Sequence, residues 1–366
     1  MPAAFGNFRK RVVMKFNDLK VEAQYFAQAI TRQWKQVSDS GMFLFGPQGQ
    51  LLEKNMAQLS NRKYAVAVKN ATEAITFLIR KLSGKSTPII LPDFGAYPTA
   101  MAALAAQNSN LHFVPVDSTY TMNVATLPDH LKRGIVIAVH LFGNNCDMSK
   151  IIPYASQHDH IIIEDCAQST GSDTPTNQNT IKVYSFYPTK PLASMGDGGM
   201  ICTNDKRIYD WIKEYRFYGL RDDGMIERAG VNSRMDEWQA AVVNAKFKDF
   251  DDLNQKRIVV ANQYKKIVRG ITTRGRCIYH QFPMRFLKRD QLIVPELIKR
   301  DIPYIIHYPY HVSDHPVFNY LKYQTPFRIN HQIISLPCHP FMEQHEIDKV
   351  IEFLADFKKW EVGAGA

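Results

Sequence analysis

Short apolar runs alternate with segments of helical periodicity along the chain, and this alternation limits the possible folds more than any other feature. The runs expected to form strands are residues 64–69, 88–93, 111–117, 134–142 and 160–165. Strands that are apolar along their whole length are buried on both faces, which is typical of parallel strands covered by helices. The sequence therefore predicts an α/β domain built around a mainly parallel sheet.

A second β-rich stretch, residues 182–204, has little helix between its strands, so the sheet is expected to be mixed. Helices are expected at residues 18–37, from Met235 to Arg269 as one helix or two, and at 343–360. The elements after residue 250 are shorter. We therefore divide the chain into a large α/β domain, residues 1–250, and a smaller C-terminal α+β domain, residues 251–366.

The composition excludes several classes of protein. The chain has 366 residues, of which 45% are apolar and 22% charged, as is ordinary for a globular protein. No apolar run approaches the ~18 residues of a membrane span, and the N-terminal sequence lacks the apolar core of a secretory signal. Five scattered cysteines without a CxxC pair argue against a disulfide framework and a zinc site. We expect a cytoplasmic protein with no membrane partner and no metal.

The formal net charge of +10 fits a nucleic-acid surface, a field that attracts a small anion, or plain solubility. The basic residues are spread out, with a modest concentration from Lys256 to Arg276, and no nucleic-acid-binding motif accompanies them. The small-anion and solubility interpretations are therefore favoured, and no nucleic-acid partner is expected.

Three polar features follow predicted strands, at the sheet edge where ligands of open α/β proteins bind. Asp165 ends the strand HIIIED, and Lys190 follows VYSFY, with Ser185 five residues before it. The third feature, Asn70-Ala71-Thr72, lies between a strand and a helix. Alone, each has a structural explanation as a turn acid, a loop charge or a helix cap. Together they are the parts of a pyridoxal phosphate (PLP) site: a lysine for the Schiff base, a carboxylate for the pyridine nitrogen, and donors for the phosphate.

Five segments, in order, resemble the DegT/DnrJ/StrS family of PLP-dependent sugar aminotransferases. They are DSGMFLFGPQGQLLEKNMAQL (39–59), IIIEDCAQSTGS (161–172), YSFYPTKPLASMGDGGMICTND (184–205), GVNSRMDEWQAA (230–241) and SLPCHPFMEQHEIDKVIEFL (335–354). The resemblance spans most of the chain. It implies the aspartate-aminotransferase fold, PLP fold type I, which matches the two-domain division above.

The resemblance also implies a reaction. Lys190 would hold PLP as an internal aldimine and carry a proton between the substrate carbon and the cofactor, while Asp165 would pair with the pyridine nitrogen. Gln168 would lie against the ring near its 3′-oxygen. The implied activity is a ping-pong transfer of an amino group from glutamate, or another amino acid, to a keto group of a nucleotide-linked deoxysugar. Such reactions serve amino-sugar synthesis for lipopolysaccharide, O-antigen and other glycans, and the motifs leave amination at C3 or C4 open.

The phosphate of PLP would be held by Ala71, Thr72 and Ser185, as the resemblance implies. Asn232 would reach the phosphate of a neighbouring subunit, because members of the family are homodimers with shared sites. The structural alternative is that Asn232 only caps the helix that follows it.

Two departures from the family pattern concern the cofactor. Ala71 replaces a glycine that allows close approach of the backbone to the phosphate. Ala96, in PDFGAYPT, stands where the family usually has an aromatic, so that Phe94 or Tyr97 would supply the stacking face, or the face is thinner. Tyr97 and His311 are expected at the substrate pocket, the latter from its match to the P-x-H segment of the family.

The histidines and tyrosines between residues 304 and 311 give weaker signals. His307 and His311 are four residues apart, but Pro309 breaks helical geometry and argues against a metal pair. We interpret Tyr304, Tyr308 and Tyr310 as packing residues.

The same residues disfavour two alternative functions. A dehydratase of the same family would carry histidine in place of Lys190. A non-catalytic regulator or binding protein on this fold would have no need of Lys190, Asp165 and Ser185 together.

Overall fold

The computed structural model describes residues 14–172, 179–326 and 328–363. Most of the N-terminal sequence in which we expected no secretory signal lies outside these ranges. None of the helices formed by the described residues combines the length and the apolarity needed to cross a membrane. The five cysteines are all buried and unpaired.

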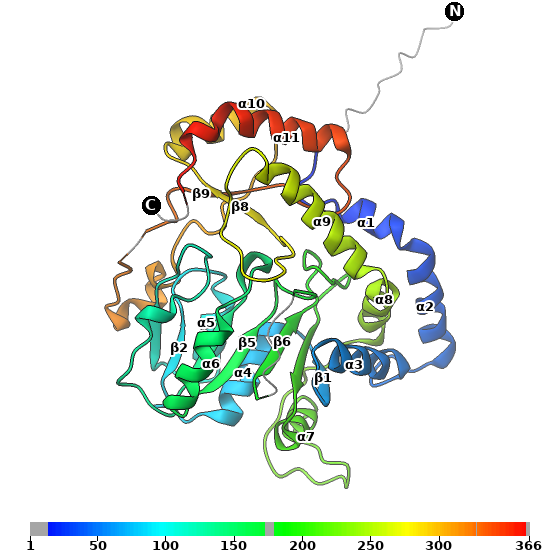
Figure 1. Ribbon diagram of the computed structural model, residues 1–366. Helices are drawn as coiled ribbons and strands as arrows, with labels where there is room; N and C mark the ends of the chain where they lie inside the picture. Colours follow the sequence, from blue (N-terminus) through cyan, green and yellow to red (C-terminus); the bar gives the residue numbers. More distant parts are fainter. Residues whose placement is uncertain (1–13, 173–178, 327, 364–366) are drawn as a thin grey trace, which may run out of the picture.

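A seven-stranded sheet, ordered β1-β7-β6-β5-β4-β2-β3, lies at the centre of the large part of the molecule (Figure 1). Its strands are β1 (Tyr64–Val68), β2 (Ile89–Pro92), β3 (Leu111–Val114), β4 (Ile135–Val139), β5 (Ile161–Asp165), β6 (Ile181–Ser185) and β7 (Gly199–Thr203). All of them run in one direction except β7, which is antiparallel to both of its neighbours. The predicted mixed, mainly parallel sheet is confirmed.

The described α-helices lie before, between and after these strands in the chain. They are α1 (Leu19–Tyr25), α2 (Ala27–Ser40), α3 (Pro47–Leu59), α4 (Ala71–Leu82), α5 (Pro98–Ala105), α6 (Met148–Gln157), α7 (Lys206–Tyr215), α8 (Glu237–Phe247), α9 (Phe250–Lys265), α10 (Val294–Lys299) and α11 (Gln344–Phe357). The region predicted from Met235 to Arg269 is therefore two helices, α8 and α9, and it ends at Lys265.

Helices cover both faces of the sheet, which explains why its strands are mostly apolar. On one face, side chains such as Ile163 and Ile201 pack with α4, α5 and α7. On the other face, Ile162 packs with α6, while Met200 packs with α3 and α8. Because strand side chains alternate, Asp165 lies on the same face as Ile163 and Glu164 on the opposite face.

The predicted helix at 18–37 is wrong in two respects. It is broken at Phe26, whose buried ring packs with Val242 and Leu253, so α1 and α2 are separate helices. It also continues to Ser40, because the first strong stop signal is Gly41, which has a left-handed φ of 64° at the helix end.

The predicted strand 134–142 ends early, at Val139. Residues Leu141–Gly143 form a turn in which Phe142 and Gly143 take positive φ values of 60° and 83°. This turn lies at the carboxyl end of β4, beside the ends of β2 and β5.

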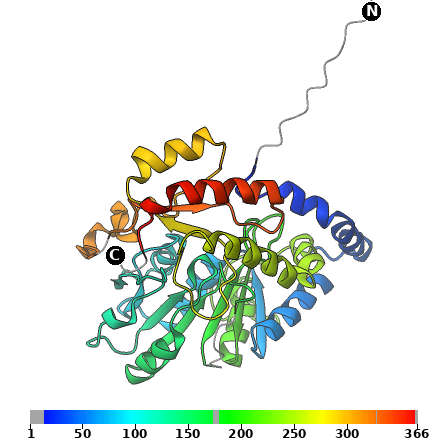
Figure 2. The ribbon, with the colours of Figure 1, turned by 45° about the horizontal axis from the view of Figure 1, so that its top comes forward.

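The C-terminal part contains a two-stranded antiparallel sheet, β8 (Phe282–Arg285) with β9 (Ile333–Leu336). Figures 1 and 2 show α9 and α11 running beside this small sheet, on the side of the main sheet where α1 also lies. The predicted small α+β unit is present. Its boundary at residue 250 coincides with the start of α9, and the division into residues 1–250 and 251–366 stays a prediction.

Candidate active site

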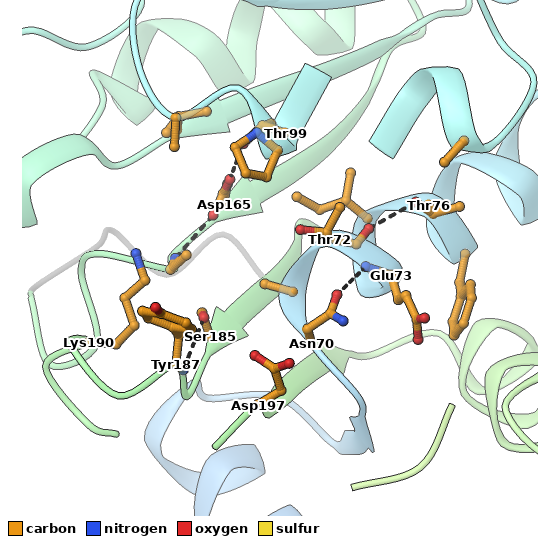
Figure 3. Close-up of a pocket in the computed structure, with 18 of the residues that line it drawn as sticks. Asn70, Thr72, Glu73, Thr76, Thr99, Asp165, Ser185, Tyr187, Lys190 and Asp197 are labelled. Atoms are coloured by element: carbon orange, nitrogen blue, oxygen red, sulfur yellow. Dashed lines mark hydrogen bonds between the residues drawn. The ribbon is translucent and has the colours of Figure 1, made fainter. Parts of the chain in front are cut away.

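A cavity of about 670 Å³ opens at the carboxyl ends of β4, β5 and β6 and the start of α4 (Figure 3). Six of the predicted site residues line it: Ala71, Thr72, Asp165, Gln168, Ser185 and Lys190. Ala71 and Thr72 are more than a hundred residues from Ser185 and Lys190 in the chain, and the sheet order brings them together. Ligands of open α/β sheets bind at this edge.

Asp165 is the last residue of β5, and its side chain is buried and held by two donors. One carboxylate oxygen accepts a hydrogen bond of 2.7 Å from the Thr99 hydroxyl, and the other accepts one of 3.1 Å from the Ala167 N–H. Figure 3 shows Thr99 reaching Asp165 from the start of α5. These two hydrogen bonds fix the position of the Asp165 carboxylate in the cavity wall.

Lys190 lies in the turn after β6, where its N–H donates to the Tyr187 carbonyl at 2.8 Å. Its side chain is only partly exposed. Burial lowers the pKa of the Lys190 amine, and the charge of Asp165 acts in the opposite direction. A lysine with a lowered pKa has more of the neutral, nucleophilic amine at a given pH.

The start of α4 presents backbone N–H groups to the cavity. Asn70 is the N-cap, and its side chain accepts a hydrogen bond of 2.8 Å from the Glu73 N–H. The capping explanation therefore holds for Asn70, while Ala71 and Thr72 line the cavity in the first turn, where N–H groups lack helical partners. Gly199 packs on this turn: a Cβ there would lie 2.4 Å from the Asn70 carbonyl carbon.

Because Ala71 is the first residue of α4, it has a helical conformation that any L-residue adopts. The replacement of the family's glycine thus requires no unusual backbone.

Across the cavity from Ala71, Ser185 ends β6, and its hydroxyl accepts a hydrogen bond of 3.3 Å from the Tyr187 N–H. Asp197, an exposed residue of the G-D-G-G turn, lies nearby (Figure 3).

The amide of Gln168 is held at both ends. Its oxygen accepts a hydrogen bond of 2.8 Å from the Phe142 N–H, and its nitrogen donates one of 3.0 Å to the Tyr308 hydroxyl. The N–H of Phe142 fixes which end of the amide is oxygen. One hydrogen of the amide nitrogen is left beyond the bond to Tyr308.

Three predicted residues are not among those that line the cavity. Tyr97 is 56% exposed, and its ring contacts His315 with a centroid distance of 5.8 Å. His311 is buried, with Nδ1 3.2 Å from the Asp93 carboxylate. Asn232 is exposed, although its neighbour Val231 is at the cavity.

The alternative that Asn232 caps the following helix is wrong. Helix α8 begins only at Glu237, with Asp236 as its N-cap. The residue next to Asn232, Ser233, is buried: its hydroxyl accepts a hydrogen bond of 3.3 Å from the Lys69 N–H and donates one to the Glu73 carboxylate. The segment is thus anchored to the start of α4 of its own chain, while Asn232 points outward.

The stacking face predicted from Phe94 or Tyr97 is not seen in the cavity wall. Phe94 is buried behind it, 1% exposed, against Tyr308 and His311. From this loop, Ala96, Pro98 and Thr99 line the cavity. The residues that line the cavity thus include Ala96 where the family has an aromatic.

Sequence reasoning missed Thr99 and His140. Thr99 could have been found, because it follows a strand and begins a helix, as Thr72 does. His140 lines the cavity and is fully buried, with Nε2 3.1 Å from the Glu164 carboxylate and Nδ1 accepting from the Cys146 N–H at 3.0 Å. Burial raises the pKa of Glu164, but the hydrogen bond and charge of His140 outweigh it and leave that pKa below its usual range.

The potential ligand atoms of His140, Glu164 and Cys166 lie within 4.8 Å of one another. Glu164 is already engaged by His140 and by the Thr180 hydroxyl, and the Arg62 guanidinium lies 3.6 Å from it. A cation would have to compete with this arginine, so the group is explained as a buried ion-pair network. The absence of a metal site stays a prediction.

Comparison with known proteins gives a consistent picture. Residues 24–355 match the model of the DegT/DnrJ/EryC1/StrS aminotransferase family. The chain is 30% identical over 363 residues to a pleiotropic regulatory protein of Geobacillus stearothermophilus, covering 93% of this chain and 97% of the relative. It is 28% identical over 360 residues to dTDP-3-amino-3,6-dideoxy-α-D-galactopyranose transaminase of Aneurinibacillus thermoaerophilus, covering 93% and 98%.

Among solved structures, the chain resembles S. venezuelae DesV in complex with a ketimine intermediate. The TM-score is 0.88 at 25% sequence identity, and the match covers 95% of this chain and 99% of that one. The fold predicted from the sequence is therefore that of solved aminotransferases.

Proposed function

Because the chain belongs to the DegT/DnrJ/EryC1/StrS aminotransferase family, we propose that it uses PLP to move an amino group onto a nucleotide-linked keto-sugar. The observation that supports this most directly is the cavity, which Lys190 and Asp165 line together with the start of α4. An amine, a fixed carboxylate and free N–H donors are the groups that PLP requires.

The residues of the cavity fit this cofactor. PLP, when bound, supplies an electron sink for the bond changes at the substrate carbon. Lys190 would bind it covalently and then move the proton at the substrate carbon. Asp165, oriented by Thr99 and Ala167, would pair with the protonated pyridine nitrogen.

Donors for the phosphate are available at two places. The N–H groups of Ala71 and Thr72 and the Thr72 hydroxyl lie at the positive end of α4, which favours an anion. The Ser185 hydroxyl, at the end of β6, would be a further donor.

The substrates we propose are an amino acid donor, glutamate by resemblance, and a nucleotide-linked keto-sugar. The proposal of a nucleotide-linked keto-sugar rests on the relative from Aneurinibacillus thermoaerophilus, whose name describes a transaminase of a dTDP-linked sugar. The net charge of +10 favours anionic substrates of this kind.

We also propose that the active protein is a homodimer. Four consecutive apolar residues, Met42, Phe43, Leu44 and Phe45, are each between 38% and 50% exposed. Phe43 stacks on Trp238, so the strip is held in place rather than free. Contiguous exposed apolar surface of this kind marks an interface, and a second copy covering it would place an exposed residue such as Asn232 near another site.

The competing functions have less support. A regulatory role is suggested by the name of the Geobacillus stearothermophilus relative alone. A regulator would have no need of an Asp165 carboxylate oriented by Thr99 in the same cavity as a lysine of lowered pKa. A dehydratase with histidine at the lysine position is disfavoured because Lys190 is present.

The test is the absorption spectrum of the purified protein with PLP. We expect a visible band that glutamate abolishes and a suitable nucleotide-linked keto-sugar restores. Borohydride should reduce the C=N bond, which removes the band and leaves the cofactor attached to the Lys190 peptide. Lys190→Ala should lack the covalent band, whereas the exposed Lys206→Ala should keep it. Labelling of another lysine, or full turnover by Lys190→Ala, would refute the proposal.

A further inference from the structure

We propose that Tyr308, a residue of the C-terminal part, is a positioning residue for the cofactor site and acts through Gln168. The inference rests on the proposed function and adds a residue to it. Tyr308 does not line the cavity itself, but its hydroxyl accepts the hydrogen bond from the Gln168 amide nitrogen at 3.0 Å. Gln168 does line the cavity.

Tyr308, Gln168 and Phe142 form a closed triangle of contacts. The Phe142 N–H donates to the Gln168 oxygen at 2.8 Å, Gln168 donates to Tyr308, and the rings of Phe142 and Tyr308 stack with an interplanar angle of 15°. Each member therefore restrains the other two. The remaining N–H of Gln168 has a direction set by both hydrogen bonds, and it is available to a group bound in the cavity.

The backbone at Phe142 is in the left-handed region. Phe142 has a φ of 60°, a conformation that costs about 1–2 kcal/mol for a residue other than glycine. The next residue, Gly143, also has a positive φ, and a Cβ there would lie 2.7 Å from Ile278 and 2.8 Å from the His280 nitrogen. This turn aims the Phe142 N–H at Gln168 and packs against the C-terminal part.

The segment that carries Tyr308 is attached independently of Gln168. His307 Nδ1 lies 2.9 Å from the Ser335 hydroxyl. Asp93, at the end of β2, accepts from the Val312 N–H at 2.7 Å and, through its side chain, from the Ser313 N–H at 2.9 Å. Removing the Tyr308 hydroxyl should therefore leave the segment in place and release only the amide of Gln168.

Tyr308 is suited to this role because it stays neutral. Burial raises its pKa to about 12; the hydrogen bond from Gln168 acts against the increase, and the charge of Asp165 adds to it. A neutral phenol oxygen accepts from Gln168 across the working pH range. The site thus depends on a hydroxyl from residue 308, although Gln168 and Lys190 belong to the large part of the chain.

The test compares the pH midpoint of the visible band of the PLP-loaded protein in four variants: Tyr308→Phe, Gln168→Ala, the double variant and Tyr310→Phe. A donor near the 3′-oxygen stabilises negative charge there, so losing its orientation should move the midpoint upward, by about half a pH unit or more. Tyr310 is the matched control, since it is two residues away and 59% exposed. Its variant should keep the wild-type midpoint.

The double variant separates an indirect from a direct role. If Tyr308 acts through Gln168, Tyr308→Phe should add no shift in the Gln168→Ala background. Equal shifts in both backgrounds would mean direct action, and an unchanged midpoint in Tyr308→Phe would mean no role; either result overturns the inference. A wild-type protein that shows no visible band with PLP, or whose Lys190 carries no cofactor after borohydride reduction, would instead refute the proposed function. Thermal unfolding of the apoproteins, expected to be similar for Tyr308→Phe and Tyr310→Phe, excludes misfolding as the cause of a shift.

Discussion

At the scale of single residues, the site depends on two groups in a partly buried cavity, the amine of Lys190 and the carboxylate of Asp165. Lys190 loses hydration in the cavity, which lowers its pKa, and the charge of Asp165 partly restores it. Asp165 in turn is held in position because Thr99 and Ala167 donate to its two carboxylate oxygens. The cavity therefore places an amine of lowered pKa and an oriented carboxylate where a cofactor could lie between them.

The first prediction concerns the pKa of Lys190 in the cofactor-free protein. Asp165→Asn removes the charge that raises this pKa, so the pKa should fall further below that of an ordinary lysine. Because only the neutral amine reacts, the midpoint of the pH-dependent labelling of Lys190 by an amine reagent should move to lower pH. Mass spectrometry of the Lys190 peptide measures this. Asp197→Asn, in the same cavity, should leave the midpoint in place, and a shift to higher pH in Asp165→Asn would contradict the prediction.

The second prediction separates the charge of Asp165 from its orientation. Asp165→Asn keeps the shape but removes the charge, and kcat should fall by about 10²–10³-fold or more, because a fixed charge facing the reacting system is lost. Thr99→Val removes only one hydrogen bond to the carboxylate, so kcat should fall about tenfold, equivalent to about 1.4 kcal/mol. Steady-state kinetics with saturating donor measures both. A kcat for Asp165→Asn within about tenfold of the wild type would assign the role to another group.

At the scale of helices and strands, the residues that end strands could be predicted from the sequence, and their partners could not. Asp165 and Ser185 follow local apolar runs, so their place at the sheet edge follows from the pattern of each run. Thr99 is 66 residues from its partner Asp165, and Tyr308 is 140 residues from Gln168. These contacts depend on the order of the strands and on the docking of the C-terminal part, which no local pattern specifies.

The helix boundaries likewise depend partly on the local sequence and partly on contacts with distant elements. The helix predicted at 18–37 ends near Gly41 as the sequence indicates, but its last residue is Ser40, because the left-handed Gly41 is the C-cap of α2. The break at Phe26 arises from burial against α8 and α9, distant elements that the local periodicity does not report. Local stop signals and distant packing thus each decide one boundary of the N-terminal helices.

The third prediction concerns Glu237, the first residue of α8, which joins two elements. Its carboxylate accepts hydrogen bonds from three N–H groups at the start of α3, those of Gly46, Gln48 and Gly49, at 3.0, 2.7 and 2.8 Å. Glu237→Gln replaces one acceptor oxygen by a donor that faces an N–H, so the free energy of unfolding should fall by about 1–3 kcal/mol.

Urea denaturation of the apoprotein measures this loss. The matched control is Glu352→Gln on the exposed face of α11, which should change the unfolding free energy by no more than about 0.5 kcal/mol. Gly49→Ala should also destabilise the protein, since its Cβ would lie 2.8 Å from the Glu237 carboxylate. Equal stabilities of Glu237→Gln and Glu352→Gln would show that the start of α3 does not depend on this carboxylate.

At the scale of the whole molecule, the site draws on both parts of the chain and presents one residue outward. Ser233 is tied to Lys69 and Glu73 at the start of α4, the turn that would hold the phosphate. The neighbouring Asn232 is exposed and forms a β-bridge with Phe217, whose ring contacts Phe45 of the exposed apolar strip. An exposed amide near such a strip agrees with the proposal that a second copy brings Asn232 to its neighbour's site.

The last prediction tests this exchange by mixing subunits. Lys190→Ala and Asn232→Ala should each be impaired alone. In a hybrid dimer, one site combines the intact Lys190 of one chain with the intact Asn232 of the other, while the second site carries both lesions. Random exchange makes about half of the dimers hybrid, so about one quarter of all sites should be active.

The matched control mixes Lys190→Ala with Asp165→Asn, whose lesions belong to the site of their own chain, and should restore nothing. If Asn232 acted within its own chain, the first mixture would also stay inactive, because every hybrid site would keep one lesion. Light scattering of each mixture establishes that dimers are present, and a monomeric protein with full activity would contradict the shared site outright.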